Sequence, residues 1–165
     1  MQYISLYPSP LGEILLACDQ IGLTGLWFEG QKYFALGLSE HITEGNMPAL
    51  ILAKQWLDLY FTGAVPDFTP PLHLIGSEFR IGIWNLLLKI PYGSTTTYGT
   101  LAKAYALQRE VRSVSAQAVG GAVGHNPISV IVPCHRVIGS SGSLTGYAGG
   151  IERKTALLLA EGIAI

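Results

Sequence analysis

A cysteine followed by a histidine and an arginine is the part of this sequence best suited to chemistry. A free thiol with a pKa near 8.5 is only about 3% ionised at neutral pH, and a nearby imidazole or other cation lowers that pKa and increases the fraction of thiolate. Pro133 restricts the backbone before the thiol, so we expect Cys134 in a rigid, non-helical bend beside the electropositive Arg136. These features favour a nucleophilic thiol over the alternative, a buried structural cysteine. The segment reads Ile131-Val132-Pro133-Cys134-His135-Arg136-Val137-Ile138.

Two further features of the chain bear on this thiol. Asn126-Pro127, eight residues before the cysteine, forms another stiff turn, and an asparagine in a turn caps free backbone groups. The second cysteine, Cys18, is far away in the sequence, so we expect two free thiols rather than a disulfide.

No basic residue precedes the first apolar stretch, which argues against a signal peptide. We therefore expect a cytoplasmic protein.

The composition is that of a folded chain rather than a disordered or membrane-embedded one. Of the 165 residues, 49% are hydrophobic and 13% are charged, with a mean hydropathy of +0.38. No apolar run approaches the roughly 20 residues that span a bilayer. Residues 1–76 hold 2 basic and 7 acidic side chains, a net charge of −5, whereas residues 77–165 hold 8 and 4, a net charge of +4. The second part is thus able to face a polyanion such as nucleic acid.

The second part of the chain must position the thiol, and it reads as helices followed by short strands and a loop. Ser77 and Thr97 are good caps for two helices, the first ending before Pro91 and the second spanning 98–106. A third helix begins near Ser113 or Ser115 and runs to residue 123. Short β-prone pieces around 133–134, a glycine-rich loop over 139–150 and a last helix over 152–161 follow. This order is that of a winged helix-turn-helix.

The third of these helices is rich in small residues. Glycine inside a helix costs about 1 kcal/mol relative to alanine, so the glycines need a reason. Either another helix packs closely against them, or the helix presses its backbone into a narrow groove of a partner, and the sequence leaves both readings open. The small residues are Ser115, Ala116, Ala118, Gly120, Gly121, Ala122 and Gly124.

The first part of the chain reads as a small α/β unit. Three strands over 2–7, 13–18 and 23–29 are separated by turns and form an antiparallel meander. A helix over 48–61 has apolar residues at helical spacing and ends before Gly63. We place the domain boundary between about Thr62 and Ser77.

Residues 77–162 resemble the O6-alkylguanine-DNA alkyltransferases, also called methylated-DNA–protein-cysteine methyltransferases. The resemblance implies an α/β + α fold, with a small N-terminal α/β (ribonuclease-H-like) domain over 1–70 and a winged helix-turn-helix catalytic domain over 77–165. The segment 105–114 is longer than is usual in that family. The motifs that carry the resemblance are Ala118-Val119-Gly120-Gly121, Gly124-His125-Asn126-Pro127, Pro133-Cys134-His135-Arg136, Gly146-Tyr147-Ala148-Gly149-Gly150 and Glu161-Gly162.

The resemblance also implies catalytic roles. Cys134 would accept the alkyl group, and His135 would act as a general base through a water molecule. Glu161 would hold the imidazole of His135 in the required tautomer. Asn126 would tie the recognition helix to the active-site turn, and Tyr98 would donate to the flipped guanine and help to rotate the phosphate outward.

A second set of residues is expected from the resemblance to contact DNA or the damaged base. Gln117 stands where the family often has an arginine that fills the gap left by the flipped nucleotide, so we expect weaker and less salt-dependent binding. Ala148 stands where many relatives have a serine near O6, and the Val137 carbonyl would face the exocyclic amine of guanine. The full set is Gln117, Ser115, Ala116, Val137, Tyr147, Ala148 and Arg136.

The activity implied is DNA repair by direct reversal of alkylation. The alkyl group of O6-alkylguanine, and of O4-alkylthymine, would pass irreversibly to Cys134 after base flipping, so that each molecule acts once. The partner would be double-stranded DNA, entered through the minor groove by a monomer. No cofactor is expected and no metal, because Cys18 with His41 and His73 is not an adequate zinc ligand set.

Three other functions are compatible with a winged helix and a reactive thiol. The first is a non-catalytic protein that binds alkyl lesions, but the family members of that kind lack the acceptor cysteine. The second is a winged-helix regulator, and the third is a cysteine hydrolase that acts without DNA.

Overall fold

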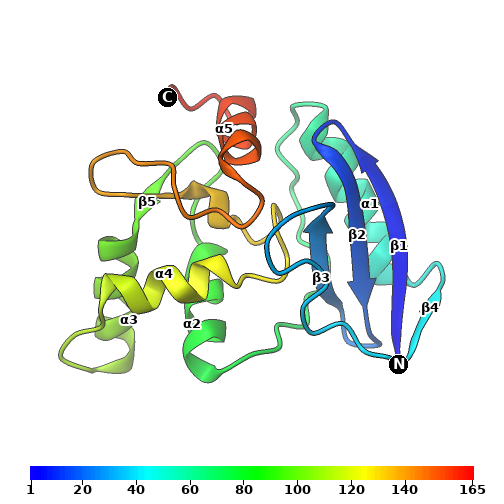
Figure 1. Ribbon diagram of the computed structural model, residues 1–165, viewed down its shortest axis with the longest axis horizontal. Helices are drawn as coiled ribbons and strands as arrows, with labels where there is room; N and C mark the ends of the chain where they lie inside the picture. Colours follow the sequence, from blue (N-terminus) through cyan, green and yellow to red (C-terminus); the bar gives the residue numbers. More distant parts are fainter. The chain divides into compact units, whose positions relative to one another are not determined.

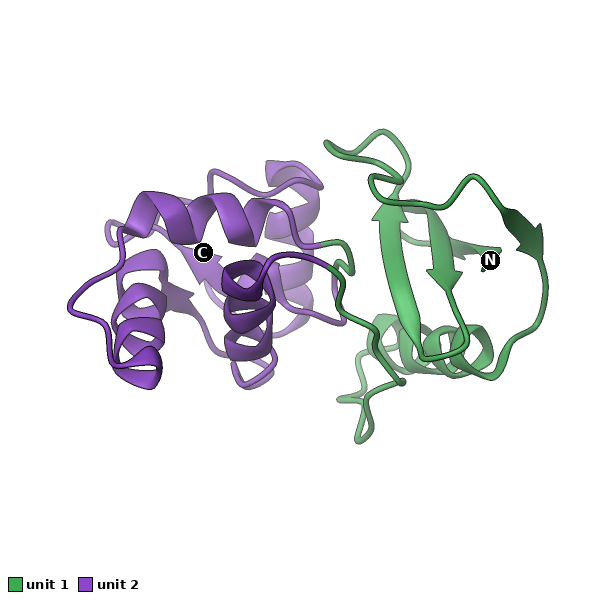
Figure 2. Ribbon diagram, turned by 90° about the horizontal axis from the view of Figure 1, so that it is seen from below, with its two compact units in different colours: residues 1–75, 127–129 green, residues 76–126, 130–165 purple.

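The computed structural model describes residues 1–165, and the chain divides into two compact units (Figures 1 and 2). Unit 1 consists of Met1–Ile75 with Pro127–Ser129, and unit 2 consists of Gly76–Asn126 with Val130–Ile165. The return of three residues to unit 1 was not predicted. It is fixed by backbone bonds at Leu26, whose N–H donates to the Pro127 carbonyl at 2.8 Å and whose carbonyl accepts from Ser129 at 3.1 Å. None of the helices combines the length and the apolar character that a membrane span requires.

Unit 1 contains a four-stranded sheet in the order β3-β2-β1-β4. The predicted antiparallel meander is confirmed: β1 pairs with β2, and β2 pairs with β3. The short strand β4 was not predicted, because its three exposed residues show no alternation; it pairs in parallel with β1. The strands are β1 (Gln2–Ser9), β2 (Gly12–Cys18), β3 (Leu23–Phe28) and β4 (Ile42–Glu44).

One helix, α1 (Pro48–Phe61), covers a face of this sheet (Figure 1), with the bounds predicted from its periodicity. Proline is tolerated at its start because the first N–H groups of a helix have no intrahelical acceptor. Leu50, Ala53 and Leu57 lie at helical spacing and are almost fully buried. Gly63 follows the helix with a φ of +90°, a conformation that glycine adopts without steric cost.

Unit 2 is built from four helices, and side-chain caps set the starts of the first three. The predicted caps are confirmed: Ser77 and Thr97 accept hydrogen bonds from the backbone N–H groups of Arg80 and Thr100. Ser115, one of two candidates, accepts from Ala118. The helices are α2 (Glu78–Leu87), α3 (Tyr98–Arg109), α4 (Ala116–Gly124) and α5 (Ile151–Ala160).

A two-stranded parallel sheet completes unit 2. It joins β5 (Thr96–Thr97) to β6 (Val137–Ile138). The prediction of β structure around residues 133–134, and of a non-helical bend at Cys134, is wrong. Cys134–Arg136 form a single 3₁₀ turn, closed by a hydrogen bond from the Arg136 N–H to the Pro133 carbonyl at 3.0 Å. An α/β unit followed by helices with a small wing confirms the predicted α/β + α class.

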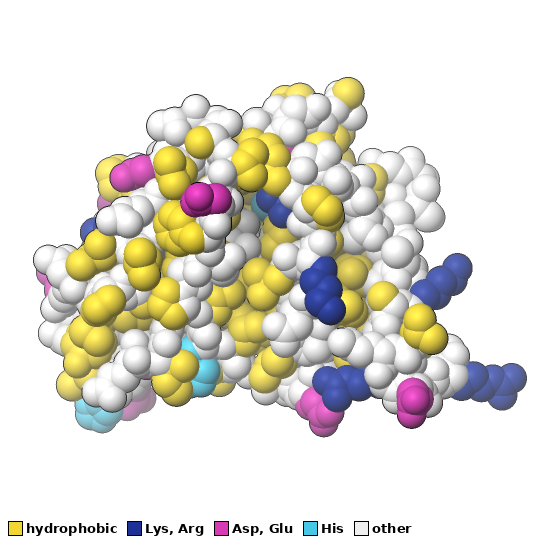
Figure 3. All heavy atoms as spheres, turned by 180° about the vertical axis from the view of Figure 1, so that it is seen from behind, with side chains coloured by type: hydrophobic (Ala, Val, Ile, Leu, Met, Phe, Trp, Pro, Cys, Tyr) yellow, Lys and Arg dark blue, Asp and Glu magenta, His cyan; other side chains and the backbone are white.

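The charged side chains are sparse on the surface. On the face shown in Figure 3, hydrophobic and uncharged polar atoms separate most of them, and one acidic and one basic side chain touch at the lower edge.

Candidate active site

The 3₁₀ turn places Cys134 inside unit 2, where the residue is only 4% exposed. The side chain of Asn126, two residues after the end of α4, donates to Sγ of Cys134 at 3.1 Å and to the Val132 carbonyl at 2.8 Å. One amide therefore holds the sulfur and the backbone two residues before it. α4 is itself held by α2, because the Trp84 indole N–H donates to the Ala122 carbonyl at 2.8 Å.

His135 is fully buried and hydrogen-bonded to Glu161, which lies at the end of α5. Its Nε2 is 2.6 Å from Oε2 of Glu161. Hydrogen bonds from His135 and Arg136 hold the pKa of the Glu161 carboxyl at about 2 against the effect of burial, so the carboxylate is ionised at neutral pH. Burial lowers the pKa of His135, so the imidazole is neutral. A carboxylate only accepts, so Nε2 carries the proton and Nδ1, which has no hydrogen-bond partner, keeps a free lone pair.

Arg136 occupies a different place from the one predicted. We expected it to contact DNA, but its side chain is buried and makes hydrogen bonds within unit 2. Its Nε donates to Oε1 of Glu161 at 2.8 Å, its Nη1 donates to the Ile90 carbonyl at 2.8 Å, and its guanidinium stacks 5.7 Å from the centre of the Tyr92 ring. The predicted DNA contact is therefore corrected: Arg136 clamps the Glu161 carboxylate beside His135.

The groups that lower the pKa of the Cys134 thiol do not include the imidazole of His135. Burial raises its pKa, and the largest opposing effect is the hydrogen bond from Asn126, followed by the charge of Lys154 and the backbone N–H groups of Cys134 and His135. The imidazole of His135 is directed toward Glu161 instead. The neighbourhood that favours the thiolate is thus made of an amide, a lysine and backbone dipoles.

Lys154 is a residue that the sequence reasoning missed. It lies in α5 and is 1% exposed, and its Nζ donates to the Val137 carbonyl at 2.5 Å. A signal was present in the sequence, since Lys154 shares a helical face with Leu157, Leu158 and Glu161 at spacings of three, four and seven residues. A lysine on the buried face of a helix needs an explanation.

Tyr98 begins α3 and lies against the glycine-rich loop. Its hydroxyl is 3.5 Å from the Thr145 carbonyl, and a Cβ added to Gly146 would lie 3.1 Å from it. Burial, with the Cys134 charge, raises the pKa of Tyr98, so the phenol keeps its proton. Further along the loop, a Cβ on Gly149 would lie 2.5 Å from the ring of Tyr147. The loop glycines thus make room for the two tyrosines. Ala148, between Gly146 and Gly149 in the sequence, is half-buried.

The predicted DNA-contact residues of α4 lie on an exposed surface. Ser115, Ala116 and Gln117 are all exposed, and no hydrogen bond joins them to the side chains around Cys134. Close packing does not require the glycines of this helix. A Cβ on Gly121 or Gly124 would meet nothing within 4 Å, and a Cβ on Gly120 would lie at an ordinary contact distance, 3.9 Å, from the Tyr98 ring. The reading in which another helix packs tightly against these glycines therefore finds no support in the fold.

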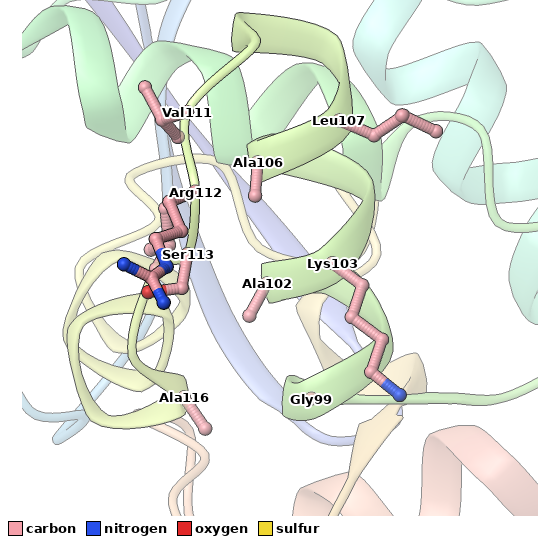
Figure 4. A pocket seen from close by; sticks show the side chains of 10 residues that line it. Gly99, Ala102, Lys103, Ala106, Leu107, Val111, Arg112, Ser113 and Ala116 are labelled. Atoms are coloured by element: carbon pink, nitrogen blue, oxygen red, sulfur yellow. The ribbon is translucent and has the colours of Figure 1, made fainter.

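A groove of about 530 Å³ lies between α3 and the segment that leads into α4. Figure 4 shows Lys103 and Arg112 on opposite sides of it, with Ala102 and Ala106 of α3 between them. None of the active-site side chains lines this groove. Two cations, Lys103 and Arg112, thus line the groove together with Ala116, the first residue of α4.

The residues considered for zinc are arranged otherwise. His73 Nδ1 is 2.5 Å from Oδ2 of Asp19, and Cys18 is buried with its pKa raised by that burial to about 11. No group of three or more His, Cys, Asp or Glu side chains in the chain is placed to hold a metal ion.

Comparisons with known proteins find relatives for both parts of the chain. Residues 2–74 match the model of the ribonuclease-like domain of 6-O-methylguanine DNA methyltransferase, and residues 78–163 match that of its DNA-binding domain. The chain is 42% identical over 161 residues to a methylated-DNA–protein-cysteine methyltransferase of Methanosarcina acetivorans, covering 97% of this chain and 98% of that one. A relative of the same name from Mycolicibacterium paratuberculosis is 43% identical over 155 residues, covering 93% and 88%.

A solved structure is similar over nearly the whole chain. It is that of Mycobacterium tuberculosis OGT in complex with DNA, with a TM-score of 0.83 and 42% identity, covering 96% of this chain and 92% of that one. Both halves of the chain match, and the relatives have nearly the same length. The chain belongs to the 6-O-methylguanine DNA methyltransferase family.

Proposed function

We propose that this protein repairs O6-alkylguanine in DNA by moving the alkyl group to Cys134 in a single, irreversible turnover. The family supports the reaction class. The observation that carries the assignment of the acceptor is the convergence of Asn126 on the sulfur of Cys134, beside the His135–Glu161 pair.

The first step is removal of the thiol proton. His135 is the base, because Glu161 fixes the proton on Nε2 and leaves the Nδ1 lone pair free. The proton passes from Cys134 to Nδ1 through one water molecule. The imidazolium that forms is stabilised by the Glu161 carboxylate, which Arg136 keeps in place.

The second step is transfer of the alkyl group. The thiolate attacks the alkyl carbon in line, a carbon–sulfur bond forms, and the bond from that carbon to O6 breaks. The electron pair goes to the guanine, and the Tyr98 hydroxyl supplies a proton to the departing base. The product is a thioether, which is a poor leaving group, and no residue of the site is placed to remove the alkyl group. Each molecule is therefore consumed, and no cofactor takes part.

Access to the base requires the nucleotide to leave the duplex. Flipping costs a few kcal/mol and is easiest for a weakened pair such as one with O6-alkylguanine. We assign entry to the minor groove by α4, where Ser115 and Ala116 contact the backbone and Gln117 fills the gap in the stack. Gly121 has no side chain and faces open space, so the backbone of the helix can approach the DNA closely there.

The flipped base is recognised by the turn and the loop that follow. The Val137 carbonyl has a second lone pair beside the one bound by Lys154, and it accepts from the exocyclic amine of guanine. Tyr147 and Ala148 form the other wall of the site. O4-alkylthymine is the second substrate. The protein acts as a monomer in the cytoplasm, where both free cysteines stay reduced.

Intact-mass measurement after incubation with an O6-methylguanine duplex tests the assignment. The expected result is one added methyl group per chain, located on Cys134 by peptide mapping and absent from Cys134→Ala. Cys18→Ser is the matched control, because it removes the other buried thiol and leaves transfer unchanged. A chain that binds the duplex without gaining mass would instead indicate a lesion-binding protein, and ester or peptide turnover without DNA a cysteine hydrolase.

A further inference from the structure

The side chain of Lys154 is a buried cation without a carboxylate partner. Its residue is 1% exposed, and none of the four ion pairs of the protein includes it. Its hydrogen bond to the Val137 carbonyl supplies one neutral acceptor. A buried ammonium is unfavourable unless something compensates its charge, so its place in the core requires a reason.

The position of Lys154 offers that reason. The Val137 carbonyl to which it donates belongs to the residue that directly follows the Cys134–Arg136 turn, and α5 packs against this turn. The charges of Lys154 and Cys134 act on each other: the lysine lowers the pKa of the thiol, and the thiolate raises the pKa of the lysine against the effect of burial.

The other charged and titratable groups around the thiol are already committed. Glu161 accepts from both His135 and Arg136, so the carboxylate and the guanidinium compensate each other. Tyr98, from α3, keeps its proton because its pKa is raised. Lys154 is the cation that these pairings leave without a counter-charge.

We propose that Lys154 is a positioning residue of the transfer reaction, whose buried ammonium holds the Val137 carbonyl and provides the counter-charge of the Cys134 thiolate. The inference rests on the proposed function, since it assumes that the thiolate is the reacting species. The thiolate in turn compensates the buried ammonium, so the two charges stabilise each other in the state that reacts.

Three substitutions separate the charge from the hydrogen bond. Lys154→Met removes both, Lys154→Gln keeps a donor for the Val137 carbonyl without the charge, and Lys154→Arg keeps the charge. Lys89→Met is the matched control, because it removes an exposed lysine of the same unit. Thermal unfolding of each variant is recorded first, and Lys154→Gln carries the test if Lys154→Met does not fold.

The readout is the pH profile of two reactions of Cys134. One is single-turnover methyl transfer from the duplex, and the other is alkylation by iodoacetamide without DNA, in a Cys18→Ser background. We expect the Met and Gln variants to react about tenfold more slowly at pH 7, with a midpoint about one pH unit higher and recovery in alkaline solution. Lys154→Arg and Lys89→Met keep the original midpoint.

Two results would overturn the inference. One is a loss of rate by the same factor at every pH, which a purely structural role of Lys154 produces. The other is an unchanged midpoint in both Lys154→Gln and Lys154→Met. If the unmodified protein takes no methyl group from DNA, the proposed function fails, whereas the iodoacetamide profile still decides the part played by Lys154.

Discussion

The side-chain amide of Asn126 donates one hydrogen bond to the sulfur of Cys134, at 3.1 Å, and another to the Val132 carbonyl, at 2.8 Å. Both donors of one amide are thereby used, and the nucleophile is fixed relative to the end of α4. Asn126 lies two residues after the end of α4, and its side chain bonds the sulfur. It therefore links the helix that we assign to DNA binding with the thiol that we assign to the lesion.

Asn126→Ala tests this link. Hydrogen bonds to charged groups contribute about 1.5–3 kcal/mol, so we expect the single-turnover rate to fall roughly 10- to 100-fold and the free energy of unfolding to fall by about 1–3 kcal/mol. Quench-flow transfer assays and urea denaturation measure the two effects. A full rate in a folded Asn126→Ala protein would contradict the role of the amide.

Glu161→Gln tests the ionised carboxylate. Because the folded pKa of Glu161 is lowered from 4.5 to about 2, its contribution to stability is present above pH 4.5 and is lost as the pH falls toward 2. His135 acts in the same direction, since its lowered pKa means that the unfolded chain binds its proton first. We expect Glu161→Gln to lose roughly 3 kcal/mol of stability at neutral pH and to flatten the dependence below pH 4.5. Denaturation at a series of pH values measures this, and equal slopes in the two proteins would refute it.

Arg136→Met distinguishes a structural clamp from a DNA contact. The side chain is buried between Glu161, Ile90 and Tyr92, so its loss leaves the Glu161 charge partly uncompensated and should destabilise the fold by about 3–5 kcal/mol. At a temperature where the variant is folded, its affinity for an undamaged duplex should be unchanged, and so should the salt dependence of that affinity. Fluorescence anisotropy over a range of salt concentrations measures both. A shallower slope would restore Arg136 as a phosphate contact.

Gln117→Arg tests the exposed face of α4. Each additional phosphate contact steepens the plot of log affinity against log salt by about 0.9, so the substitution should increase the slope by about that amount. Arg112→Ala, at the groove beside Ala116, is the opposite change and should make the slope shallower. If neither variant changes the slope, the duplex does not contact this end of α4.

Gly121→Ala separates the two explanations for the small residues of α4. A Cβ at this exposed position meets nothing within 4 Å, so the helix should gain up to about 1 kcal/mol of stability. If the helix backbone presses into the minor groove, the same methyl group should weaken DNA binding. Thermal unfolding and anisotropy are compared for one protein. A stabilised variant with unchanged affinity would remove the functional explanation.

Local features of the sequence were the ones that predicted structure well. The caps Ser77 and Thr97, and the apolar spacing of residues 48–61, act within one or two turns. α2 and α3 begin where their caps predicted, and α1 has the bounds that its apolar spacing predicted. α3 nevertheless runs three residues beyond its predicted end at Ala106, to Arg109, because Glu110 adopts a left-handed conformation that ends it there.

Features that depend on distant partners were missed. β6 is a strand because Val137 pairs with Thr96, and β4 is a strand because it lies beside β1. Arg136 was misjudged for the same reason, since its acceptors Ile90 and Glu161 lie 46 and 25 residues away. The resemblance to a family identified the other residues of the site, but a residue's partners had to be read from the fold.

The 4% exposure of Cys134 has a consequence for a molecule that can react only once. Any oxidant or small electrophile that modified the sulfur would inactivate the protein, just as alkyl transfer from a lesion does. Enclosing the sulfur slows such losses, because a freely diffusing reagent must enter the core, whereas a flipped nucleotide is brought in by the binding energy of a whole duplex. Burial thus makes the thiol harder to ionise, and it also preserves a thiol that can react only once for its reaction with DNA.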